Sequence, residues 1–296
     1  MTGLTAARVG SAWAAAEPVW ALVADNAGVQ ADAAQALLTD WRAIHKDREL
    51  QIHTVKDWPT SGQPSALVTL GSAALRAALE RLEAQPGWAR VPAIAALVPR
   101  EGVPESWKHA TGPLTAAYLD QPFERYLDLI RLALPRLSKV GVLVGPEAAL
   151  NSPAMFKAAN DRGMHLSVGR VTHPDGMHNA LRAVLAECDV LLVLPDSSVA
   201  SSAGLQHMLA SAYRQRTPVV AYSPALVKAG AALGLYASPA QVGRQVAQML
   251  HAMLYGAGRP APRLAEGVTV AVNEQVCRSL GLDVPDGDTL AEAIRR

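Results

Sequence analysis

The sequence predicts an α/β protein in which two Rossmann-like lobes, each built on a parallel sheet, are joined by a hinge. Short apolar runs end in polar or glycine-rich turns, a helical pattern follows each turn, and this alternation recurs along most of the chain. Runs that are continuously rich in valine and leucine are typical of strands buried on both faces of a parallel sheet. The run at 139–144 starts a second series with the same plan, which predicts the second lobe.

The first series has five apolar runs with helical patterns between them. We expect strands at 19–24, 50–55, 66–70 and 92–98, and the fifth apolar run is 114–119. Apolar residues at helical spacing predict a helix over 31–46, and a second helix over 73–84 follows the third strand. Ser72 stands where an N-cap would stand for that second helix. A further helix is expected to open at Asp120-Gln121-Pro122 and to run through Leu134.

The second series continues to the end of the chain. We expect strands at 139–144, 165–171, 189–194, 217–221, 232–237 and 268–272. The patterns between and after them predict helices at 153–162, 176–187, 199–214, 239–254 and 273–280. Ser238-Pro239 places a cap residue and a proline where a helix start favours them, so we expect this long late helix to begin there.

The order of these elements predicts where the chain passes between the lobes. One passage falls near 119–122 and another near 236–237. We therefore expect residues 17–119 and 237–262 to form the first lobe, and residues 120–236 and 263–296 to form the second. Lobes connected in this way can close around a ligand by hinging.

Composition excludes several classes of protein. The chain has 296 residues, half of them hydrophobic, which is incompatible with a disordered chain. Its formal net charge of +1 gives no electrostatic reason to expect a nucleic-acid partner. No apolar stretch approaches the roughly 18 residues that a membrane-spanning helix needs.

The amino terminus resembles the end of a secretory signal. Residues 1–16 finish in small residues of the A-x-A kind before Glu17-Pro18, although the apolar core of a signal is missing. These residues leave two possibilities open, a signal-peptide remnant of a periplasmic protein and an alanine-rich leader of a cytoplasmic one.

Signatures of catalysis and of cofactor binding are missing from the sequence. It contains no phosphate-binding G-x-x-x-x-G-K-[ST] loop, no G-x-G-x-x-G after its first strand and no G-x-S-x-G nucleophile elbow. The two cysteines, Cys188 and Cys277, are too few for a metal site. We therefore expect no catalytic residues, no cofactor and no metal, and a protein that binds rather than converts its ligand.

Polar turns at the carboxyl ends of strands are the expected ligand site, because ligands of open parallel sheets bind there. The candidates are Asp25-Asn26, Gly71-Ser72, Asn151-Ser152 and Asp196-Ser197, with Tyr222 and Tyr236 as an apolar or stacking wall. Helix N-termini behind the serine turns would attract a carboxylate, whereas Asp196 would pair with an ammonium group. The alternative for Asp196 and Ser197 is that they only cap the following helix.

Several segments of the second half resemble a family of ABC-transporter substrate-binding proteins, the tryptophan/tyrosine-binding type. The run 140–147 is similar to the family's "vGvlynp.e.ns" pattern, and 188–199 is similar to "vDal.vppDntv". Three further segments match in order along the chain. Residues 216–231 resemble "kiPvf…vk.GAl", 242–247 resemble "lGrqaa", and 273–282 resemble "vN...A..lGl.iP". The resemblance covers about 139–285 in detail and the first half in plan.

This resemblance implies a type I periplasmic-binding fold with three crossovers between the lobes and a ligand enclosed in the cleft. By the match to the family motif, Asp196 is the best candidate for a ligand contact, and Asn151, Ser152 and Ser197 lie on matching turns. The family's central "iTG" hinge pattern is replaced here by Leu119-Asp120-Gln121-Pro122.

We therefore expect a monomeric solute-binding protein that captures a small polar ligand, such as an amino acid, for an ABC-type membrane permease. One alternative is a ligand-sensing module that signals to a receptor or kinase partner. The other is a two-lobed enzyme, such as a glycosyltransferase or isomerase, which would need acid and base groups facing each other across the cleft.

Overall fold

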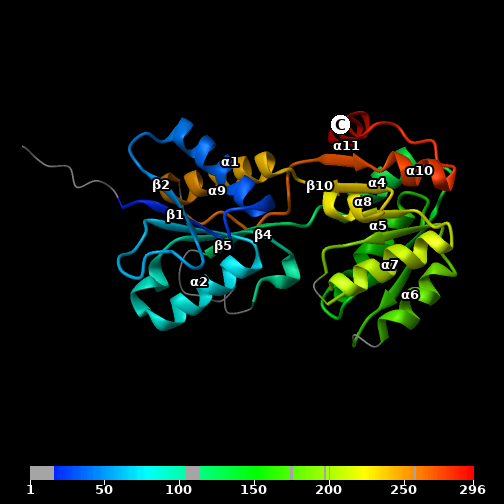
Figure 1. Ribbon diagram of the computed structural model, residues 1–296, viewed down its shortest axis with the longest axis horizontal. Helices are drawn as coiled ribbons and strands as arrows, with labels where there is room; N and C mark the ends of the chain where they lie inside the picture. The colour runs from blue at the N-terminus through cyan, green and yellow to red at the C-terminus, as the bar shows by residue number, and fades with distance from the viewer. Residues whose placement is uncertain (1–16, 105–113, 174–175, 197, 200, 257) are drawn as a thin grey trace, which may run out of the picture.

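The computed structural model describes residues 17–104, 114–173, 176–196, 198–199, 201–256 and 258–296. The expected signal-peptide remnant at 1–16 and the candidate Ser197 lie outside these residues. Two lobes lie side by side along the long axis of the molecule, and each is built around one sheet (Figure 1). The predicted class, two α/β lobes joined by a hinge, is confirmed.

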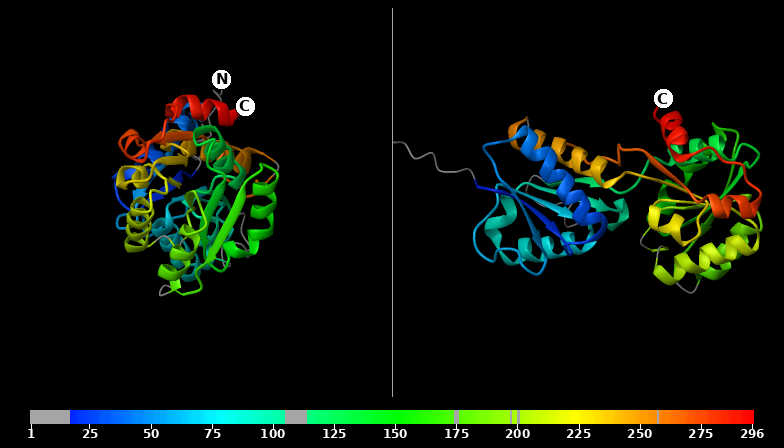
Figure 2. Two further views of the ribbon diagram at one scale, coloured as in Figure 1. Left: turned by 90° about the vertical axis from the view of Figure 1, so that its right-hand side faces the viewer. Right: turned by 45° about the horizontal axis from the view of Figure 1, so that its top comes forward.

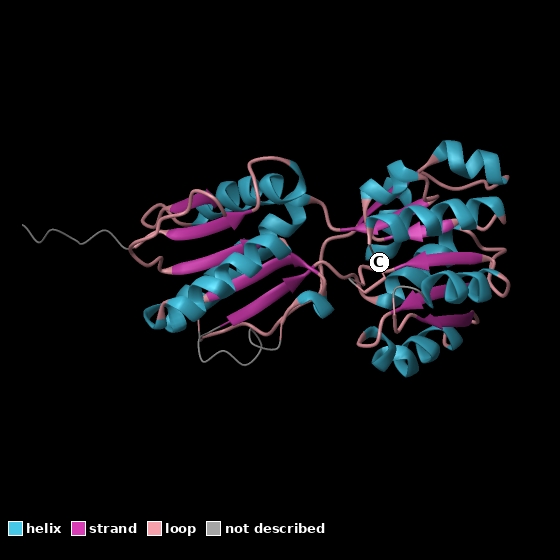
Figure 3. Ribbon diagram, turned by 60° about the horizontal axis from the view of Figure 1, so that its bottom comes forward, coloured by secondary structure: helices cyan, strands magenta, loops and turns pink. Residues whose placement is uncertain are grey.

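The sheet of the first lobe has the order β2-β1-β3-β4-β5, and all of its neighbouring strands pair in parallel. Its strands are β1 (Val19–Val23), β2 (Leu50–Thr54), β3 (Ala66–Leu70), β4 (Ala93–Val98) and β5 (Leu114–Tyr118). Every residue of β1, β3 and β4 is buried, as the unbroken apolar runs predicted. These strands end toward the second lobe (Figure 3).

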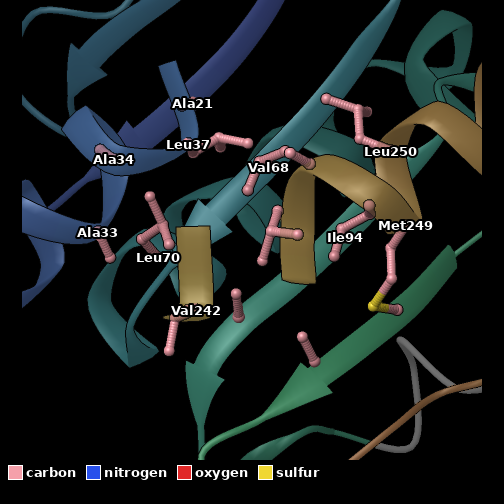
Figure 4. Close-up of a cluster of buried hydrophobic side chains, with 14 of the residues drawn as sticks. Ala21, Ala33, Ala34, Leu37, Val68, Leu70, Ile94, Val242, Met249 and Leu250 are labelled. Atoms are coloured by element: carbon pink, nitrogen blue, oxygen red, sulfur yellow. The ribbon is translucent and has the colours of Figure 1, made fainter. Parts of the chain in front are cut away.

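Helices cover both faces of this sheet. Helix α1 (Gly28–Ile44) packs beside α9 (Pro239–Tyr255), and their apolar residues form one core with β1, β3 and β4 (Figure 4). Gly243 of α9 permits the close approach, since a Cβ there would lie 2.6 Å from the backbone nitrogen of Leu37. Helix α2 (Ser72–Ala84) contributes to a separate core that includes Trp20 and Trp88. A helix distant in sequence thus completes the first lobe.

The second sheet has the order β11-β10-β9-β8-β6-β7, and β11 is its one antiparallel strand. The parallel sheet that the sequence predicted is therefore mixed at this edge. Its strands are β6 (Lys139–Val144), β7 (His165–Arg170), β8 (Val190–Val193), β9 (Val219–Ala221), β10 (Leu233–Tyr236) and β11 (Thr269–Val272). Strand β11 follows a helix that returns from the other lobe, so it enters the sheet from the opposite direction.

The helices of the second lobe include two that the sequence analysis did not predict. They are α8 (Pro224–Ala229), which Ser223 caps, and α11 (Gly287–Arg295), which Asp286 caps. The others are α4 (Phe123–Ala133), α5 (Ser152–Asn160), α6 (Met177–Leu185), α7 (Ser202–Arg214) and α10 (Glu274–Leu280). Helix α8 spans fewer than two turns, too few for an apolar periodicity to reveal it.

Three segments carry the chain between the lobes. The first joins β5 to α4, the second joins β10 to α9, and the third joins α9 to β11 (Figure 2). The first and third run side by side, because Tyr118 donates its backbone N–H to Arg263 and Ala265 donates its own to Asp120. The described part of the chain contains no helix with the length and apolar character that crossing a membrane requires.

Side-chain amides fasten these crossing segments to one another. Gln121, which is 5% exposed, donates its Nε2 to the carbonyl of Gly267 at 2.7 Å. Gln241 donates to the carbonyl of Val268 and accepts from the Thr269 hydroxyl, while its carboxamide oxygen also accepts the Ser238 backbone N–H. Each glutamine therefore joins two crossing segments.

Gln245 and Arg125 add two more ties to the third segment. Gln245 donates its Nε2 to the Leu264 carbonyl at 2.9 Å, and its oxygen accepts the Glu266 N–H at 3.1 Å. Arg125 of α4 donates to the Ala265 carbonyl at 2.9 Å and to the Gln121 side-chain oxygen at 2.8 Å. Buried backbone groups that would otherwise lack partners are thereby satisfied.

Replacing Gln245 by leucine is expected to lower the free energy of unfolding by about 1–3 kcal/mol. The substitution leaves a carbonyl and an N–H of the third segment without partners in a site that is 5% exposed. Urea denaturation followed by circular dichroism measures the change. The matched control is Gln248→Leu, one turn further along α9 on its exposed face, and an equal loss in both variants would contradict the proposed tie.

Candidate functional site

A cavity of about 230 Å³ lies between the two lobes. Residues of the first lobe, of the first and third crossing segments and of the second lobe all contribute to its wall. They are Arg100, Glu101, Asp120, Gln121, Phe123, Glu124, Ala148, Asn151, Ala154, Met155, Leu194, Pro195, Asp196 and Leu264. The cavity therefore opens where the carboxyl ends of strands from the two sheets meet, as in other open α/β sheets.

An irregularity at the end of β4 positions the residues that the first lobe contributes to the cavity wall. The pairing of β4 with β5 shifts register between Ala96 and Val98, and Leu97 between them has φ of 54°. Residues other than glycine rarely adopt this left-handed conformation, and such a bulge changes the direction in which the following residues point. The chain then enters the short 3-10 helix Arg100–Gly102, whose first two residues reach the cavity.

Asp120 stands at the first crossing segment and faces Arg100. Its carboxylate accepts the backbone N–H of Arg100 at 2.8 Å, which joins the end of β4 to the hinge. Burial raises the pKa of Asp120 to about 6, with Glu101 contributing repulsion and the Arg100 N–H opposing the shift. Burial also raises the pKa of Glu101, and Asp196 and Glu147 of the other lobe raise it further. Carboxylates of both lobes thus interact across the cavity.

Asp196 is 3% exposed and joins the ends of two strands in the second lobe. One carboxylate oxygen accepts the Gly145 N–H at 2.5 Å and the other accepts the Ser198 N–H at 2.9 Å. A Cβ on Gly145 would lie 2.9 Å from Asp196 Oδ1 and 2.6 Å from the Ser198 Cβ, so only glycine allows this approach. Asp196 therefore lines the cavity and also holds the turn after β8 against the turn after β6.

The N-cap of the following helix α7 is Ser201, whose hydroxyl accepts the Gly204 N–H at 3.1 Å. Ser201, and not Asp196, therefore caps α7, so the alternative role predicted for Asp196 is wrong.

Asn151 and Ser152 follow β6, but they have different surroundings. Asn151 is exposed, lines the cavity and makes no side-chain cap bond to α5. Ser152 is 2% exposed and donates its hydroxyl to the Ala149 carbonyl at 2.7 Å. Asn151 therefore lines the cavity, whereas Ser152 stabilises the turn between β6 and α5.

The turns after β1 and β3 lie outside the residues that line this cavity. Asp25 and Asn26 are exposed, and Asp25 accepts the Ala27 N–H at 3.1 Å. Gly71, with φ of 91°, is the N-cap of α2. Ser72 is the exposed first residue of that helix and makes no cap bond, so its expected capping role is wrong: the left-handed turn at Gly71 shifts the helix start by one residue.

Tyr222 and Tyr236 are half-buried and also lie outside the lining of the cavity. Tyr222 packs against the cores on both faces of the second sheet. Burial raises the pKa of both phenols.

Several lining residues were not predicted from the sequence. Glu101, Phe123 and Met155 reach the cavity from the end of β4, the first turn of α4 and the first turns of α5. The end of the strand predicted at 92–98 was a signal for Glu101, because ligands of parallel sheets bind beyond the carboxyl ends of strands.

The described residues contain no cluster of three or more histidine, cysteine or carboxylate groups that could hold a metal ion. Cys188 and Cys277 are both buried and free, and burial raises the pKa of the Cys188 thiol to about 11. Burial raises the pKa of the Cys277 thiol as well, so both thiols favour the protonated form at neutral pH.

Comparison with known proteins identifies similar sequences and folds. The family model described as ABC transporter substrate binding protein matches residues 100–294. A search of curated protein sequences finds no match.

Solved structures share the fold at low sequence identity. A conserved domain protein from Vibrio cholerae is 20% identical with a TM-score of 0.63, over 94% of this chain and 98% of that one. An ABC domain from Streptococcus pneumonia in complex with L-Trp is 15% identical with a TM-score of 0.62, over 93% and 98%. A substrate binding protein with adhesive properties from Clostridium difficile, in its ligand-free, open structure, is 14% identical with a TM-score of 0.66, over 91% and 96%.

Asp196→Asn is expected to lower the free energy of unfolding by about 1–3 kcal/mol. An amide presents one oxygen, so its NH₂ group faces one of the two backbone N–H donors that the carboxylate now accepts. Chemical denaturation measures the loss. Asp32→Asn, at an exposed position of α1, provides the matched control, and an Asp196 variant as stable as that control would leave the carboxylate without a structural role.

Proposed function

This chain belongs to the family of ABC transporter substrate-binding proteins, and from that premise we propose that it encloses its ligand in the interlobe cavity. The family model covers 195 of the 296 residues, counted from 100 to 294, and these include every described residue of the lining. Proteins of this kind capture a small molecule and deliver it to a membrane permease. The open question is which residues of this chain do so.

One observation supports the location most strongly. The cavity receives side chains from both lobes and from two crossing segments, so a ligand there would touch every part that moves when the lobes close. Contacts made on both sides of a hinge favour the closed arrangement, because a ligand shifts a conformational equilibrium by its differential affinity for the two states.

We propose that residues 17–119 with 237–262, and 120–236 with 263–296, move as the two units. The packing of α9 on α1 supports the first grouping, and the common core of α4, α11 and the second sheet supports the second. The crossing segments, fastened by Gln121, Gln241 and Gln245, are the proposed axis.

We propose roles for the candidate residues according to their positions. Asn151 contacts the ligand through its amide, and Asp196 contributes charge while it holds its turn. Ser152 holds the turn that carries Asn151, and Ser197, the next residue in the sequence after Asp196, is a further proposed ligand contact. Asp25, Asn26, Gly71 and Ser72 follow strands of the first lobe. In the second lobe, Tyr222 follows β9 and Tyr236 is the last residue of β10. These six would add contacts as closure narrows the space between the sheets.

The partner, location and assembly also follow from family membership as proposals. We propose a periplasmic monomer that hands its ligand unchanged to a permease and binds no nucleic acid. The near-neutral net charge of +1 supports the proposal that it binds no nucleic acid. Light scattering on a sizing column should give a mass near 31.2 kDa, and a mass of twice that value at micromolar concentration would contradict the monomer.

Ligand capture can be tested with the protein as purified. We expect native mass spectrometry to detect a small molecule that stays with the protein, and adding it at 100 times its dissociation constant should stabilise the fold by about 2.7 kcal/mol. Ala154→Trp should abolish this stabilisation, because Ala154 lines the cavity and an indole would fill it.

Lys157→Trp is the control for added bulk, since Lys157 lies on the same helix with its side chain 76% exposed and away from the lining. Equal stabilisation of both variants would place the site elsewhere. Recovery of a chemically altered ligand after incubation would favour an enzyme instead.

A further inference from the structure

Carboxylates dominate the charge around the interlobe cavity. Glu101, Asp120, Glu124 and Asp196 line it, whereas Arg100 is the one basic side chain among the described residues of that wall. The whole chain carries a formal charge of only +1, so this excess of negative charge is local. A wall of this kind selects among ligands by charge, because a cleft lined by one sign of charge concentrates the opposite sign.

The positive side chains near these carboxylates act on them at a distance: Arg100 on Glu101 and Asp120, and Arg162 on Glu124. Among the described residues, no lysine, arginine or histidine forms an ion pair with any of the four carboxylates. Asp120 and Asp196 accept backbone N–H groups, which relieve part of their charge. Arg100 is exposed, so water screens its charge more than that of a buried partner.

Closure of the lobes makes this charge more costly. Glu101 follows a strand of the first lobe, whereas Asp196 and Glu124 belong to the second, and Asp196 already raises the pKa of Glu101 across the gap. Bringing like charges closer while removing water increases their repulsion. A cation held between them would reverse the sign of that interaction, so the same carboxylates would then favour closure.

The remaining wall is apolar and suits the body of a small organic molecule. Phe123, Met155, Leu194 and Leu264 line it together with two alanines. A cation near an aromatic face gains further attraction, which Phe123 offers at the entry to α4. Inorganic cations would leave this surface unused, because they need several oxygen ligands and no apolar contact.

We propose that the cavity takes a small organic cation, an amine or quaternary ammonium group on an apolar body, without a carboxylate. This inference rests on the proposed function and names the chemical class of its ligand. A zwitterionic amino acid would set its own carboxylate among four others, with a single exposed arginine to balance it.

Paired probes that differ only by a carboxylate test this proposal. Calorimetric titration at pH 7.5 compares 2-phenylethylamine with phenylalanine, and tryptamine with tryptophan; choline and butylamine extend the range of cations. We expect the amine of at least one pair to bind about tenfold or more tightly than its amino acid, a difference of about 1.4 kcal/mol. Tighter binding of the amino acid in each pair, or binding by none of the cations, overturns the proposal.

These outcomes are distinguishable from a failure of ligand capture itself. If native mass spectrometry finds a neutral or acidic ligand that also stabilises the protein, the cation proposal fails and the binding function stands. If no small molecule is found and none in a metabolite library stabilises the fold, the proposed function fails as well.

Neutralising one carboxylate in the cavity wall and one elsewhere on the surface gives a matched pair of variants that test the role of charge in binding. Glu101→Gln should weaken binding of the amine at least about fivefold, whereas Glu80→Gln, at an exposed position of α2 away from the cavity, should leave it unchanged. Far-ultraviolet circular dichroism checks that both variants fold. Equal affinities for the two variants would show that the Glu101 carboxylate is not part of the site.

The pH dependence supplies a readout that loss of packing would not produce. The groups facing Asp120 are Arg100, Glu101 and the Tyr126 hydroxyl, and the pKa of Asp120 is about 6. Lowering the pH from 7.5 to 5 should therefore protonate Asp120 and weaken binding of an amine that stays charged throughout. Asp120→Asn should reduce this drop, and an affinity that rises toward pH 5 would contradict the proposal.

Discussion

Hydrogen bonds between side-chain amides and the backbone of the crossing segments determine how the two lobes stand relative to each other. Gln121 and Gln241 each bond one crossing segment to another, and Gln245 bonds α9 to the third segment. Arg125 of α4 donates hydrogen bonds to the Gln121 side chain and to the Ala265 carbonyl of the third segment. Because amides offer a donor and an acceptor together, Gln241 and Gln245 each satisfy two backbone groups, and Gln121 bonds one backbone carbonyl and the Arg125 side chain. The cavity between the lobes has a defined shape only while these segments stay together.

The cavity follows from this arrangement and from the polarity of parallel strands. Strands of the first lobe end toward the second, and the turns after β4, β6 and β8 supply its wall together with the first crossing segment (Figure 3). Helices then cover the faces of each sheet and leave the strand ends open. Burial of the Asp120 and Glu101 carboxylates costs free energy, and the raised pKa of each reflects that cost. A ligand that neutralises them links occupancy to closure.

The sequence was sufficient to predict the strands and the lobes, because continuous apolar runs report burial on both faces. It also located Asp196 and Asn151 on the wall of the cavity, since both follow strands. It could not predict that Asp196 accepts the N–H of Gly145, fifty-one residues earlier in the chain, or that Asp25 and Ser72 lie outside this wall. Glu101 and Asp120 were missed as a pair, because their interaction depends on the bulge at Leu97 and on burial. Such long-range contacts have no periodic pattern in a sequence.

The central claim is that a ligand held in the cavity closes the lobes about the tied crossing segments. Double electron–electron resonance measures the distance between the lobes directly, with spin labels at Glu80→Cys in α2 and Gln206→Cys in α7. Both positions are exposed and can be labelled, whereas the native Cys188 and Cys277 are buried. The ligand is the small-molecule fraction released from natively purified protein and returned to the emptied protein. The account predicts a shorter and narrower distance distribution at saturation. A distribution that stays unchanged while the ligand raises the melting temperature would contradict it.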